Sequence, residues 1–340
     1  MKPASRDKLN IASKLTPRKA FNLMRLRTSF YWSRLTKKPS VWGMPFSISI
    51  EPTTACNLGC TECPSGLKAF SRPTGNLQTG LNKEIIDQLK KKLVYINYYF
   101  QGEPYINPSF LDMVKYASDN GIYTSTSTNA HFLSEENCRR TIESGLDRLI
   151  ISIDGTTQET YQSYRRRGSL EKVIEGTRTF MKVRNEMGAK KPFVIFQFLV
   201  VKPNEHQIDE VNALGRELGV DEVRFKTAQF YDYENGNPLM PDNLDYSRYK
   251  RTKDGSYRLK NKLYNKCWRM WQGCVITWDG KVVPCCFDKD AHHQLGTVEE
   301  TAFRNIWNCK PYKDFRKNIL SGRDQIEICR NCTEGTKVWT

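Results

Sequence analysis

Three cysteines early in the chain have the residue type and spacing of an iron–sulfur cluster site. Cys56, Cys60 and Cys63 are separated by three and then by two residues. One short loop can therefore wrap three thiolates around a cubane cluster and leave one corner without a protein ligand. Structural zinc sites and closed clusters take four protein ligands. The triad predicts a site at which another molecule completes the coordination.

A second group of cysteines lies near the carboxyl end. Residues 275–284 read as a β-hairpin that turns at Asp279-Gly280 and brings its flanking thiols together. A later C-x2-C pair can close a four-thiolate site with them. The predicted ligands are Cys267, Cys285, Cys329 and Cys332. Four thiolates suit an iron–sulfur cluster and structural zinc equally well, so both metals stay open at this point.

The remaining cysteines and two histidines have simpler interpretations. Cys286 neighbours a predicted ligand and could replace Cys285 as the one that binds metal. Cys138 and Cys309 fall on predicted helices and are expected to pack as small apolar residues. His292 and His293 follow the hairpin and are read as exposed loop residues.

Alternating strands and helices position the first cysteine loop. Strands are expected at 46–51, 95–100, 122–127, 149–153, 193–201 and 222–230. Helices are expected between them at 82–93, 108–120, 134–144, 170–187 and 208–218. This alternation predicts an α/β fold with a parallel sheet or barrel. The cysteine loop follows the first strand directly, and polar residues stand at the ends of the next three.

These features resemble the radical S-adenosylmethionine (radical SAM) superfamily, in which SAM completes the coordination of the iron that has no protein ligand. Gln101-Gly102-Glu103-Pro104 is similar to the family's Gly-Gly-Glu-Pro motif, which meets the SAM amino group, although Gln101 replaces the first glycine. Glu62 is a second departure, since an apolar residue commonly precedes the third cysteine. The resemblance implies these SAM contacts: Gln101, Gly102, Glu103, Pro104, Ser127, Asn129, Ser152, Asp154 and Arg165. Arg166 or Arg167 could take the place of Arg165, and Asn204, after the fifth expected strand, is a weaker match to the family.

The carboxyl-terminal cysteines resemble the SPASM/twitch extension of the same superfamily, in its version with one auxiliary cluster. The fold implied is a partial (β/α)6 barrel with a small cysteine-rich SPASM/twitch-like subdomain. The expected divisions are 1–45, an N-terminal extension; 46–235, the barrel; 236–262, a linker; and 263–340, the auxiliary cluster domain. The implied cofactors are a SAM-binding 4Fe-4S cluster, a second auxiliary 4Fe-4S cluster and SAM.

The resemblance implies a radical SAM oxidoreductase that reductively cleaves SAM to a 5′-deoxyadenosyl radical and abstracts a substrate hydrogen atom. The first hypothesis is oxidation of a small molecule, such as a sugar, alcohol or lipid precursor, with help from the auxiliary cluster. The second is a maturase of a ribosomally made peptide, and the third a non-enzymatic metal-binding scaffold. A reduced flavodoxin- or ferredoxin-type protein is the expected electron donor. No catalytic acid or base is assigned.

The positive charge of the chain is concentrated at its start. Residues 1–45 hold eleven Lys and Arg against the single acid Asp7, out of a net charge of +16. Residues 14–35 mix aromatic and basic side chains and predict an amphipathic helix. It could bind an anionic membrane or an acidic partner, or pack across the barrel with its charges in solvent. Such uneven charge does not indicate nucleic-acid binding. With no membrane span and no signal peptide, a cytoplasmic protein is expected, with the helix allowing a peripheral membrane contact.

Overall fold

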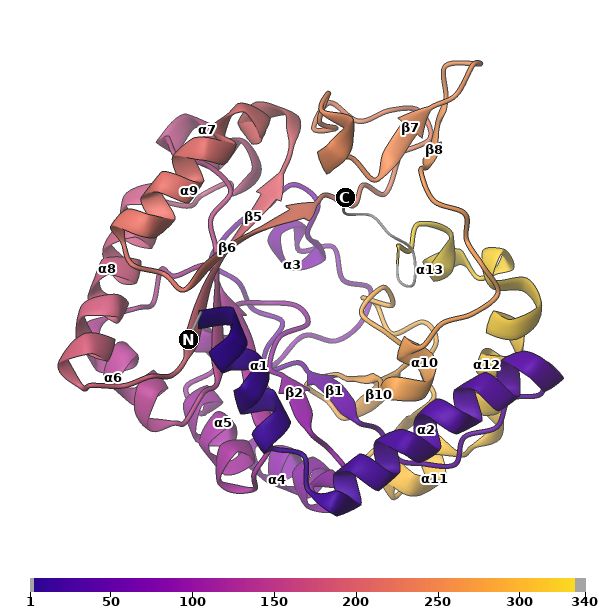
Figure 1. Cartoon of the computed structure of the whole chain (residues 1–340). Coiled ribbons are helices and arrows are strands. Elements are labelled where there is room, and N and C mark those ends of the chain that lie inside the picture. Colours follow the sequence, from indigo (N-terminus) through magenta and orange to yellow (C-terminus); the bar gives the residue numbers. More distant parts are fainter. Residues whose placement is uncertain (1–2, 334–340) are drawn as a thin grey trace.

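A computed structural model describes residues 3–333, and one curved sheet organises them (Figure 1). Six strands pair in parallel in chain order: β1 (Ser47–Ile50), β2 (Tyr95–Asn97), β3 (Tyr123–Thr128), β4 (Arg148–Ser152), β5 (Phe193–Val200) and β6 (Glu222–Thr227). The major helices between them are α4 (Thr79–Leu89), α5 (Phe110–Asp119), α6 (Glu135–Glu143), α8 (Leu170–Glu186) and α9 (Ile208–Glu217). These helices lie outside the sheet, so the predicted partial α/β barrel is confirmed.

Alternation along the strands separates an apolar outer face from a polar inner one. Ile48, Ile96 and Ile151 are buried in the core that joins the sheet to its helices. Their strand neighbours Asn97 and Ser152 line an internal cavity. Successive side chains of a strand point to opposite faces, so every second residue of a barrel strand faces inward. The inner surface of this barrel is thus built for polar contacts.

The carboxyl-terminal region extends the same sheet. β9 (Val275–Ile276) pairs in parallel with β1, and β10 (Lys281–Val283) and β11 (Gly296–Thr297) follow in antiparallel order. The predicted hairpin therefore forms, and Gly280 takes the left-handed φ of 76° at its turn. A Cβ on Gly273, just before β9, would lie 1.6 Å from the Ser47 carbonyl oxygen, so only glycine lets the chains meet there.

Shorter elements complete the chain. Helices of the last region are α10 (Arg269–Gln272), α11 (Phe303–Trp307), α12 (Lys310–Gly322) and α13 (Glu327–Arg330). The barrel also contains α3 (Pro64–Leu67) and α7 (Gln158–Tyr164), and four 3-10 turns occur at η1 (Pro104–Ile106), η2 (Lys202–Gln207), η3 (Leu244–Tyr246) and η4 (Arg323–Gln325). The segment expected as a linker, 236–262, holds an antiparallel hairpin of β7 (Tyr249–Arg251) and β8 (Tyr257–Leu259). Residues 334–340 of the expected last domain lie outside the described residues.

Two helices precede the barrel. α1 (Pro3–Ser13) crosses the end at which the strands begin, where Asp7 binds Tyr123 and Arg148, and Asn10 donates to Asp147 at 2.9 Å. α2 (Pro17–Thr36) begins at Thr16, whose hydroxyl accepts from the Lys19 N–H. The N-terminal segment is thus part of the packed structure. Among residues 3–333, no helix is both long and apolar enough to cross a membrane.

α2 packs on the carboxyl-terminal region through one apolar edge. Leu26 and Phe30 are buried, and the Phe30 ring lies edge-on to Trp268 and Trp271, with centroids 5.4 and 5.3 Å apart. The Arg27 guanidinium lies over the Trp268 ring, 3.9 Å from its centroid. The sequence allowed a helix packed across the barrel, and the structure packs this edge of α2 on the carboxyl-terminal region while the outer face of the helix stays exposed.

Candidate active site

The loop that follows β1 places three thiols on a shared cavity. Cys56, Cys60 and Cys63 line a cavity of about 580 Å³ at the carboxyl ends of the parallel strands. Burial raises the pKa of Cys56 to about 11, although the Leu58 N–H opposes the shift, and Glu103 and the other two thiols raise it further. Bound metal lowers the pKa of a thiol and makes it a thiolate. Three such thiols facing one cavity fit an iron–sulfur cluster with an open corner.

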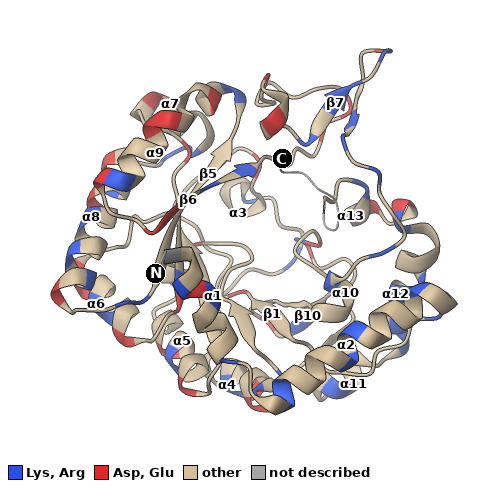
Figure 2. Ribbon diagram, in the orientation of Figure 1, with Lys and Arg blue, Asp and Glu red and all other residues tan. Residues whose placement is uncertain are grey.

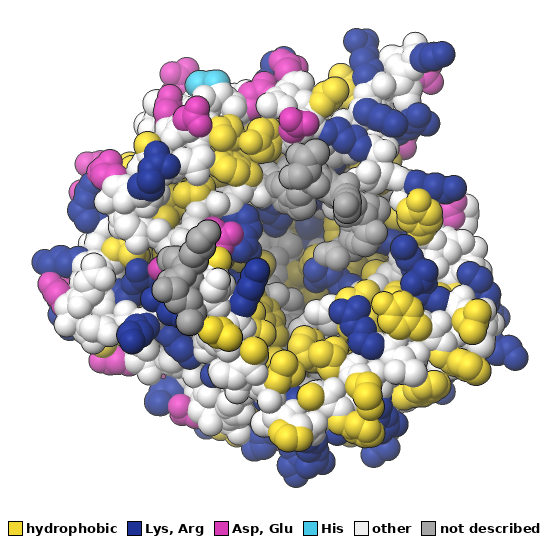
Figure 3. Space-filling model, in the orientation of Figure 1, with side chains coloured by type: hydrophobic (Ala, Val, Ile, Leu, Met, Phe, Trp, Pro, Cys, Tyr) yellow, Lys and Arg dark blue, Asp and Glu magenta, His cyan; other side chains and the backbone are white. Residues whose placement is uncertain are grey.

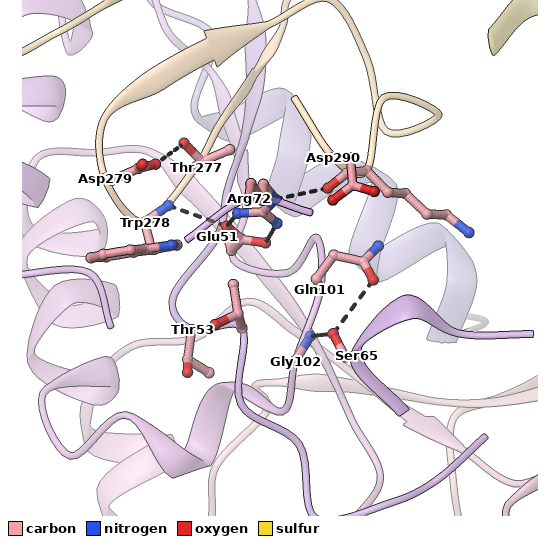
Figure 4. Close-up of polar contacts among 12 residues, drawn as sticks. Glu51, Thr53, Ser65, Arg72, Gln101, Gly102, Thr277, Trp278, Asp279 and Asp290 are labelled. Carbon is pink, nitrogen blue, oxygen red and sulfur yellow. Dashed lines mark hydrogen bonds and ion pairs between the residues drawn. The ribbon is translucent and has the colours of Figure 1, made fainter. Parts of the chain in front are cut away.

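Gly102 lets the second motif approach this loop closely (Figure 4). It has a φ of 75°, and a Cβ would lie 2.3 Å from the Thr53 carbonyl oxygen. Its N–H donates to the Ser65 hydroxyl at 2.9 Å. The Gln101 amide oxygen lies 3.5 Å from the same hydroxyl and 3.9 Å from the Cys63 Sγ. Gln101, which replaces the first glycine of the family motif, therefore fills the space beside Cys63.

Glu103 is a buried carboxylate held at the cavity. It is 2% exposed and accepts hydrogen bonds from the Thr128 hydroxyl at 2.8 Å and the Asn129 N–H at 2.7 Å. Burial raises its pKa to about 7 despite these bonds, and Arg165 is a smaller opposing influence. A carboxylate that has lost its water is ready to bind a cation. This fits the ammonium group expected of SAM.

The ends of β3 and β4 add polar groups around the same cavity. The Asn129 amide donates to the Asn57 side chain at 2.7 Å and lies 4.0 Å from the Cys56 Sγ. The Ser127 and Ser152 hydroxyl oxygens are 3.3 Å apart. Carboxyl ends of adjacent parallel strands meet at one edge, which explains why residues distant in sequence gather here.

Arg165 is held in the cavity by Asp154. Its Nε donates to the Asp154 carboxylate at 2.5 Å, and its Nη1 lies 3.9 Å from the Cys60 Sγ. Asp154 also accepts the Leu199 N–H at 2.7 Å and does not line the cavity itself. Arg166 and Arg167 do not line the cavity either. Of the three arginines weighed from the sequence, Arg165 alone lies at the cavity.

Two other predicted positions serve the local structure. Pro104 is buried and begins η1, away from the cavity lining. Asn204, a weaker match to the family, is buried and donates to the Asp154 and Leu199 carbonyl oxygens at 2.9 Å each. Both residues stabilise the loops around the cavity without facing it.

The second set of thiols also gathers in space. Burial, the Cys332 thiol and the Cys267 thiol raise the pKa of Cys329 to about 12, and Arg323 opposes the rise. Burial likewise raises the pKa of Cys285, and Cys286, Cys332 and Cys267 add to it. Cys285 and Cys329 are therefore each within electrostatic range of Cys267 and Cys332. The cationic Arg323 has its Nη2 3.2 Å from the Cys332 Sγ and suits a site rich in thiolates.

The position of Cys286 differs from that of its neighbour. Cys286 lines the large cavity together with the first cysteine triad, whereas Cys285 does not. This arrangement favours Cys285 as the quartet member, and its role as a ligand remains a prediction. Among residues 3–333, there is no group of three His, Cys, Asp or Glu side chains that could hold one metal ion. A cubane cluster does not require such a group, because each thiolate binds a different iron atom of the cluster.

Two further cysteines and the two histidines after the hairpin make local contacts. Cys138 lies on α6 and is buried in the core. Cys309 caps α12, where its Sγ accepts the Tyr312 N–H at 3.4 Å. The His292 ring lies 3.4 Å from the Ser71 hydroxyl, and the His293 ring lies 2.9 Å from the Glu327 carboxylate.

A buried ion pair, which the sequence did not reveal, joins the two cysteine regions (Figure 4). Arg72 donates to both Glu51 oxygens at 2.9 and 2.6 Å, and its Nε donates to the Lys289 carbonyl oxygen at 2.8 Å. Glu51 also accepts the Trp278 N–H at 3.3 Å. Glu51 directly follows β1 and precedes the cysteine loop, which was a usable signal, but nothing in the sequence singles out Arg72. The pair connects the loop after the first triad to the segment that carries Cys285 and Cys286.

Comparison with known protein families gives two matches. Residues 50–212 match the Radical SAM superfamily, and residues 267–333 match SPASM, an iron-sulfur cluster-binding domain. Together these regions contain both cysteine groups described above.

Individual proteins are similar over most of the chain. The tungsten-containing aldehyde ferredoxin oxidoreductase cofactor-modifying protein of Pyrococcus furiosus is 27% identical over 317 residues, covering 84% of this chain and 86% of that protein. The PqqA peptide cyclase of Gluconobacter oxydans is 27% identical over 320 residues, covering 87% and 84%. The crystal structure of Streptococcus suis SuiB bound to S-adenosylmethionine shares the fold, with a TM-score of 0.62 at 16% identity, over 91% of this chain and 76% of that one.

Proposed function

The chain belongs to the radical SAM superfamily and carries a C-terminal SPASM iron–sulfur domain, and from this premise we propose that it oxidises a small molecule. The proposed substrate is a sugar, an alcohol or a lipid precursor. The observation that carries the proposal is a cavity of about 580 Å³ lined both by the first cysteine triad and by the segment that holds Cys286. A cavity of this size suits SAM and a small substrate side by side.

The proposed cofactor contacts follow from the donor chemistry of the lining residues. Cys56, Cys60 and Cys63 would hold the SAM-binding cluster, and the quartet with Cys267 would hold the auxiliary one, proposed to be of the 4Fe-4S type. When bound, SAM and the clusters supply electrons and a radical that removes a hydrogen atom from the substrate. Glu103 would bind the SAM ammonium group and Arg165 its carboxylate. Asn129 and the serines at the ends of β3 and β4 would orient the remaining polar atoms.

A peptide maturase is the second candidate function. The similarity to the PqqA peptide cyclase over 87% of the chain supports it, whereas the relative from Pyrococcus furiosus is named as cofactor-modifying. Comparing the metabolites and peptides of wild-type and deletion strains distinguishes the two. A low-mass compound that differs by two hydrogens supports the first function, and a modified peptide supports the second. The non-enzymatic scaffold is not retained, because the chain is a radical SAM enzyme.

Reductive SAM cleavage tests the proposal directly. Anaerobically reconstituted protein with SAM and dithionite should release 5′-deoxyadenosine, measured by chromatography. Cys56→Ala with Cys60→Ala and Cys63→Ala should abolish the release, because the cluster loses all three proposed ligands. Cys309→Ala is the matched control, since its thiol caps a helix away from the cavity. Release by the triple variant at the wild-type level would refute the assignment.

We also propose that the outer face of α2 binds an anionic membrane surface. Five apolar side chains are about half exposed or more: Phe21 54%, Met24 55%, Tyr31 57%, Trp32 49% and Leu35 79%. Most are spaced three or four residues apart and so share one face of the helix. Lys and Arg occur along the α2 ribbon (Figure 2), and the space-filling view shows hydrophobic side chains gathered over α2 beside Lys and Arg (Figure 3).

The combination of aromatic residues and positive charge selects the partner. α2 contains no acidic residue, and its exposed basic residues include Arg18, Arg25 and Arg27. Amphipathic helices of this composition lie in the interface of anionic lipids. The proposed location is therefore the cytoplasm, with peripheral contact to the membrane.

Vesicle co-sedimentation tests the membrane proposal. The protein should sediment with vesicles of phosphatidylglycerol and phosphatidylcholine, and much less with phosphatidylcholine alone. Trp32→Glu with Leu35→Glu should remove binding. Leu244→Glu with Tyr264→Glu is the matched control, because these residues are 60% and 51% exposed elsewhere. Equal sedimentation of both double variants would contradict the proposal.

A further inference from the structure

The segment expected as a linker forms a strongly basic hairpin that projects from the body of the protein (Figure 1). Residues 249–262, called the basic hairpin below, contain one acidic residue, Asp254, and six basic residues: Lys250, Arg251, Lys253, Arg258, Lys260 and Lys262. Lys and Arg lie along β7 in Figure 2. A connection between two domains can be a flexible coil and needs neither strands nor this much charge. The basic hairpin therefore suggests a role of its own.

The register of the basic hairpin places two cations opposite each other. Lys250 in β7 pairs with Arg258 in β8, and both side chains are exposed. Cross-strand partners share one face of a hairpin, and like charges at such positions destabilise it. Neither side chain forms an ion pair within residues 3–333. The repulsion costs stability, and an acidic partner on this face would offset it.

The turn keeps the basic hairpin ordered in spite of this repulsion. Gly255 has a φ of 89°, and the Thr252 N–H donates to the Ser256 carbonyl oxygen at 2.8 Å. The hydroxyls of Thr252 and Ser256 donate to Asp254 and lower its pKa to about 2. The one acidic residue is thus held at the turn, and the paired strands keep their positive charge.

The inner face of the basic hairpin packs with the loop that carries the first cysteine triad. Tyr249 is 1% exposed and belongs to the same apolar cluster as Leu58 and Cys60. Tyr257 and Leu259 pack against this cluster, as do the other two cysteines of the triad. Successive side chains of a strand point to opposite faces, so the cations lie on the outer face while these residues face inward. A partner on the outer face would therefore be held beside the first triad.

The base of the basic hairpin also contacts the second cysteine region. The Tyr249 hydroxyl donates to the Asn331 amide oxygen at 2.8 Å, and Asn331 lies between Cys329 and Cys332. The Tyr233 ring stacks on Tyr249 with centroids 4.8 Å apart. These contacts fix the hairpin at the place where the two cysteine regions approach each other.

We propose that the outer face of the basic hairpin, with Lys250 and Arg258 at its centre, docks the acidic protein that supplies electrons. A reduced flavodoxin- or ferredoxin-type protein would lose one electron there, and the cluster proposed at the first triad would gain it. Complexes for electron transfer bury little surface, so one hairpin offers enough area. Opposite charges on the two proteins also speed their encounter. The inference rests on the reductive SAM cleavage proposed above and not on the choice of substrate.

An anionic membrane is the other partner that positive charge could select. Interfacial segments insert aromatic and aliphatic side chains among the lipids, as proposed for α2. The outward-facing strand residues of the basic hairpin are Lys250 and Arg258, which offer charge without such side chains. Its position beside the first triad is a further reason to favour the electron donor.

Two kinds of reductant test the inference on the reconstituted full chain with SAM. Release of 5′-deoxyadenosine is measured with dithionite and with bacterial flavodoxin or ferredoxin, each reduced by NADPH and a reductase. Lys250→Glu with Arg258→Glu should slow the release supported by the protein donors about tenfold or more, and change the release supported by dithionite less than about twofold. Added salt should slow the wild-type reaction with flavodoxin, because it screens the attraction.

A matched variant controls for the change in net charge. Lys115→Glu with Lys310→Glu alters the charge by the same amount on α5 and α12, where these lysines pair with Asp119 and Asp314. It should keep the wild-type rate with every reductant. Iron content and circular dichroism report on folding.

Two further measurements place the donor on the basic hairpin. Lys250→Gln with Arg258→Gln removes the repulsion without adding acid, and it replaces the charge-reversed variant if that variant does not fold. It should slow the flavodoxin reaction by a smaller factor. Carbodiimide cross-linking should join flavodoxin carboxylates to Lys250 and Lys253.

Three results would overturn the inference. One is a folded charge-reversed variant that keeps the wild-type rate with flavodoxin and ferredoxin. Another is a wild-type enzyme that cleaves SAM with dithionite but with neither protein donor. The third is a charge-reversed variant that loses vesicle binding in place of the flavodoxin reaction, which would assign the hairpin to the membrane. Failure of the proposed SAM cleavage would look different, since dithionite would then release no 5′-deoxyadenosine while flavodoxin would still cross-link to Lys250.

Discussion

Replacement of Glu103 by glutamine tests how the protein recognises SAM. The wild-type carboxylate is buried, and its pKa rises to about 7 because it has lost its hydration. An incoming ammonium group would favour the charged form, so binding and ionisation should be linked. Glutamine keeps the shape and can still accept a hydrogen bond from Thr128 or Asn129, but it cannot carry the charge.

The size of the effect follows from the pKa. A rise from 4.5 to about 7 corresponds to about 3 kcal/mol, at 1.36 kcal/mol per pKa unit. The pKa of Glu103 is higher in the folded protein than in the unfolded chain, so the protonated carboxyl group favours folding. This contribution to stability is fully present below pH 4.5 and is lost as the pH rises to about 7. The SAM-free variant should therefore be more stable than wild type at pH above about 7, by up to about 3 kcal/mol. The difference should shrink in acid.

The same substitution should lower the affinity for SAM, although it raises the stability of the SAM-free protein. Removing a charged hydrogen-bonding partner costs about 1.5–3 kcal/mol, or roughly ten- to a hundredfold in affinity. Wild-type affinity should fall between about five- and tenfold as the pH drops from about 7.5 to 6, because Glu103 becomes protonated. The variant should bind weakly at both pH values, with little change between them.

Calorimetry of SAM binding at these two pH values, together with thermal unfolding of the SAM-free enzyme, measures both effects on cluster-loaded protein. Lys115→Gln on the surface of α5 serves as the control for a conservative substitution far from the cavity. A wild-type affinity that does not change with pH, or a glutamine variant that binds SAM as tightly as wild type, would refute the assigned role of Glu103.

Three further predictions concern the clusters and the ion pair that joins their regions. Anaerobically reconstituted protein should contain about eight irons per chain if both sites hold cubane clusters, whereas about four irons with one zinc would contradict the auxiliary cluster. Cys329→Ala with Cys332→Ala should remove two ligands of the auxiliary cluster and leave the first cluster in place. The variant should therefore still release 5′-deoxyadenosine but form no product. A normal product yield in folded protein would show that the auxiliary site is purely structural. Arg72→Met leaves Glu51 buried without its partner and should lower the free energy of unfolding by about 3–5 kcal/mol, measured by denaturant titration. Adding Glu51→Gln should restore part of that loss, and equal stability of both variants would contradict a coupled pair.

The sequence by itself determined the features that depend on neighbouring residues. The spacing of Cys56, Cys60 and Cys63 predicts a three-thiolate loop, because a few residues of backbone set how far thiols can spread. The strand and helix pattern predicted the parallel barrel, since parallel strands must be joined by crossover connections, which are usually helices. The turn at Asp279-Gly280 predicted the hairpin, because Gly280 adopts a φ of 76° that few other residues tolerate.

The tertiary structure alone decided which distant groups meet. Sheet pairing between β1 and β9 brings the second cysteine region against the barrel and separates Cys286, on the cavity, from Cys285. The same packing buries Arg72 against Glu51 and brings Lys226 and Lys289 to the same cavity. These relations depend on strand order and register over the whole sheet. Local spacing carries no information about them, because the groups that meet are far apart in the sequence.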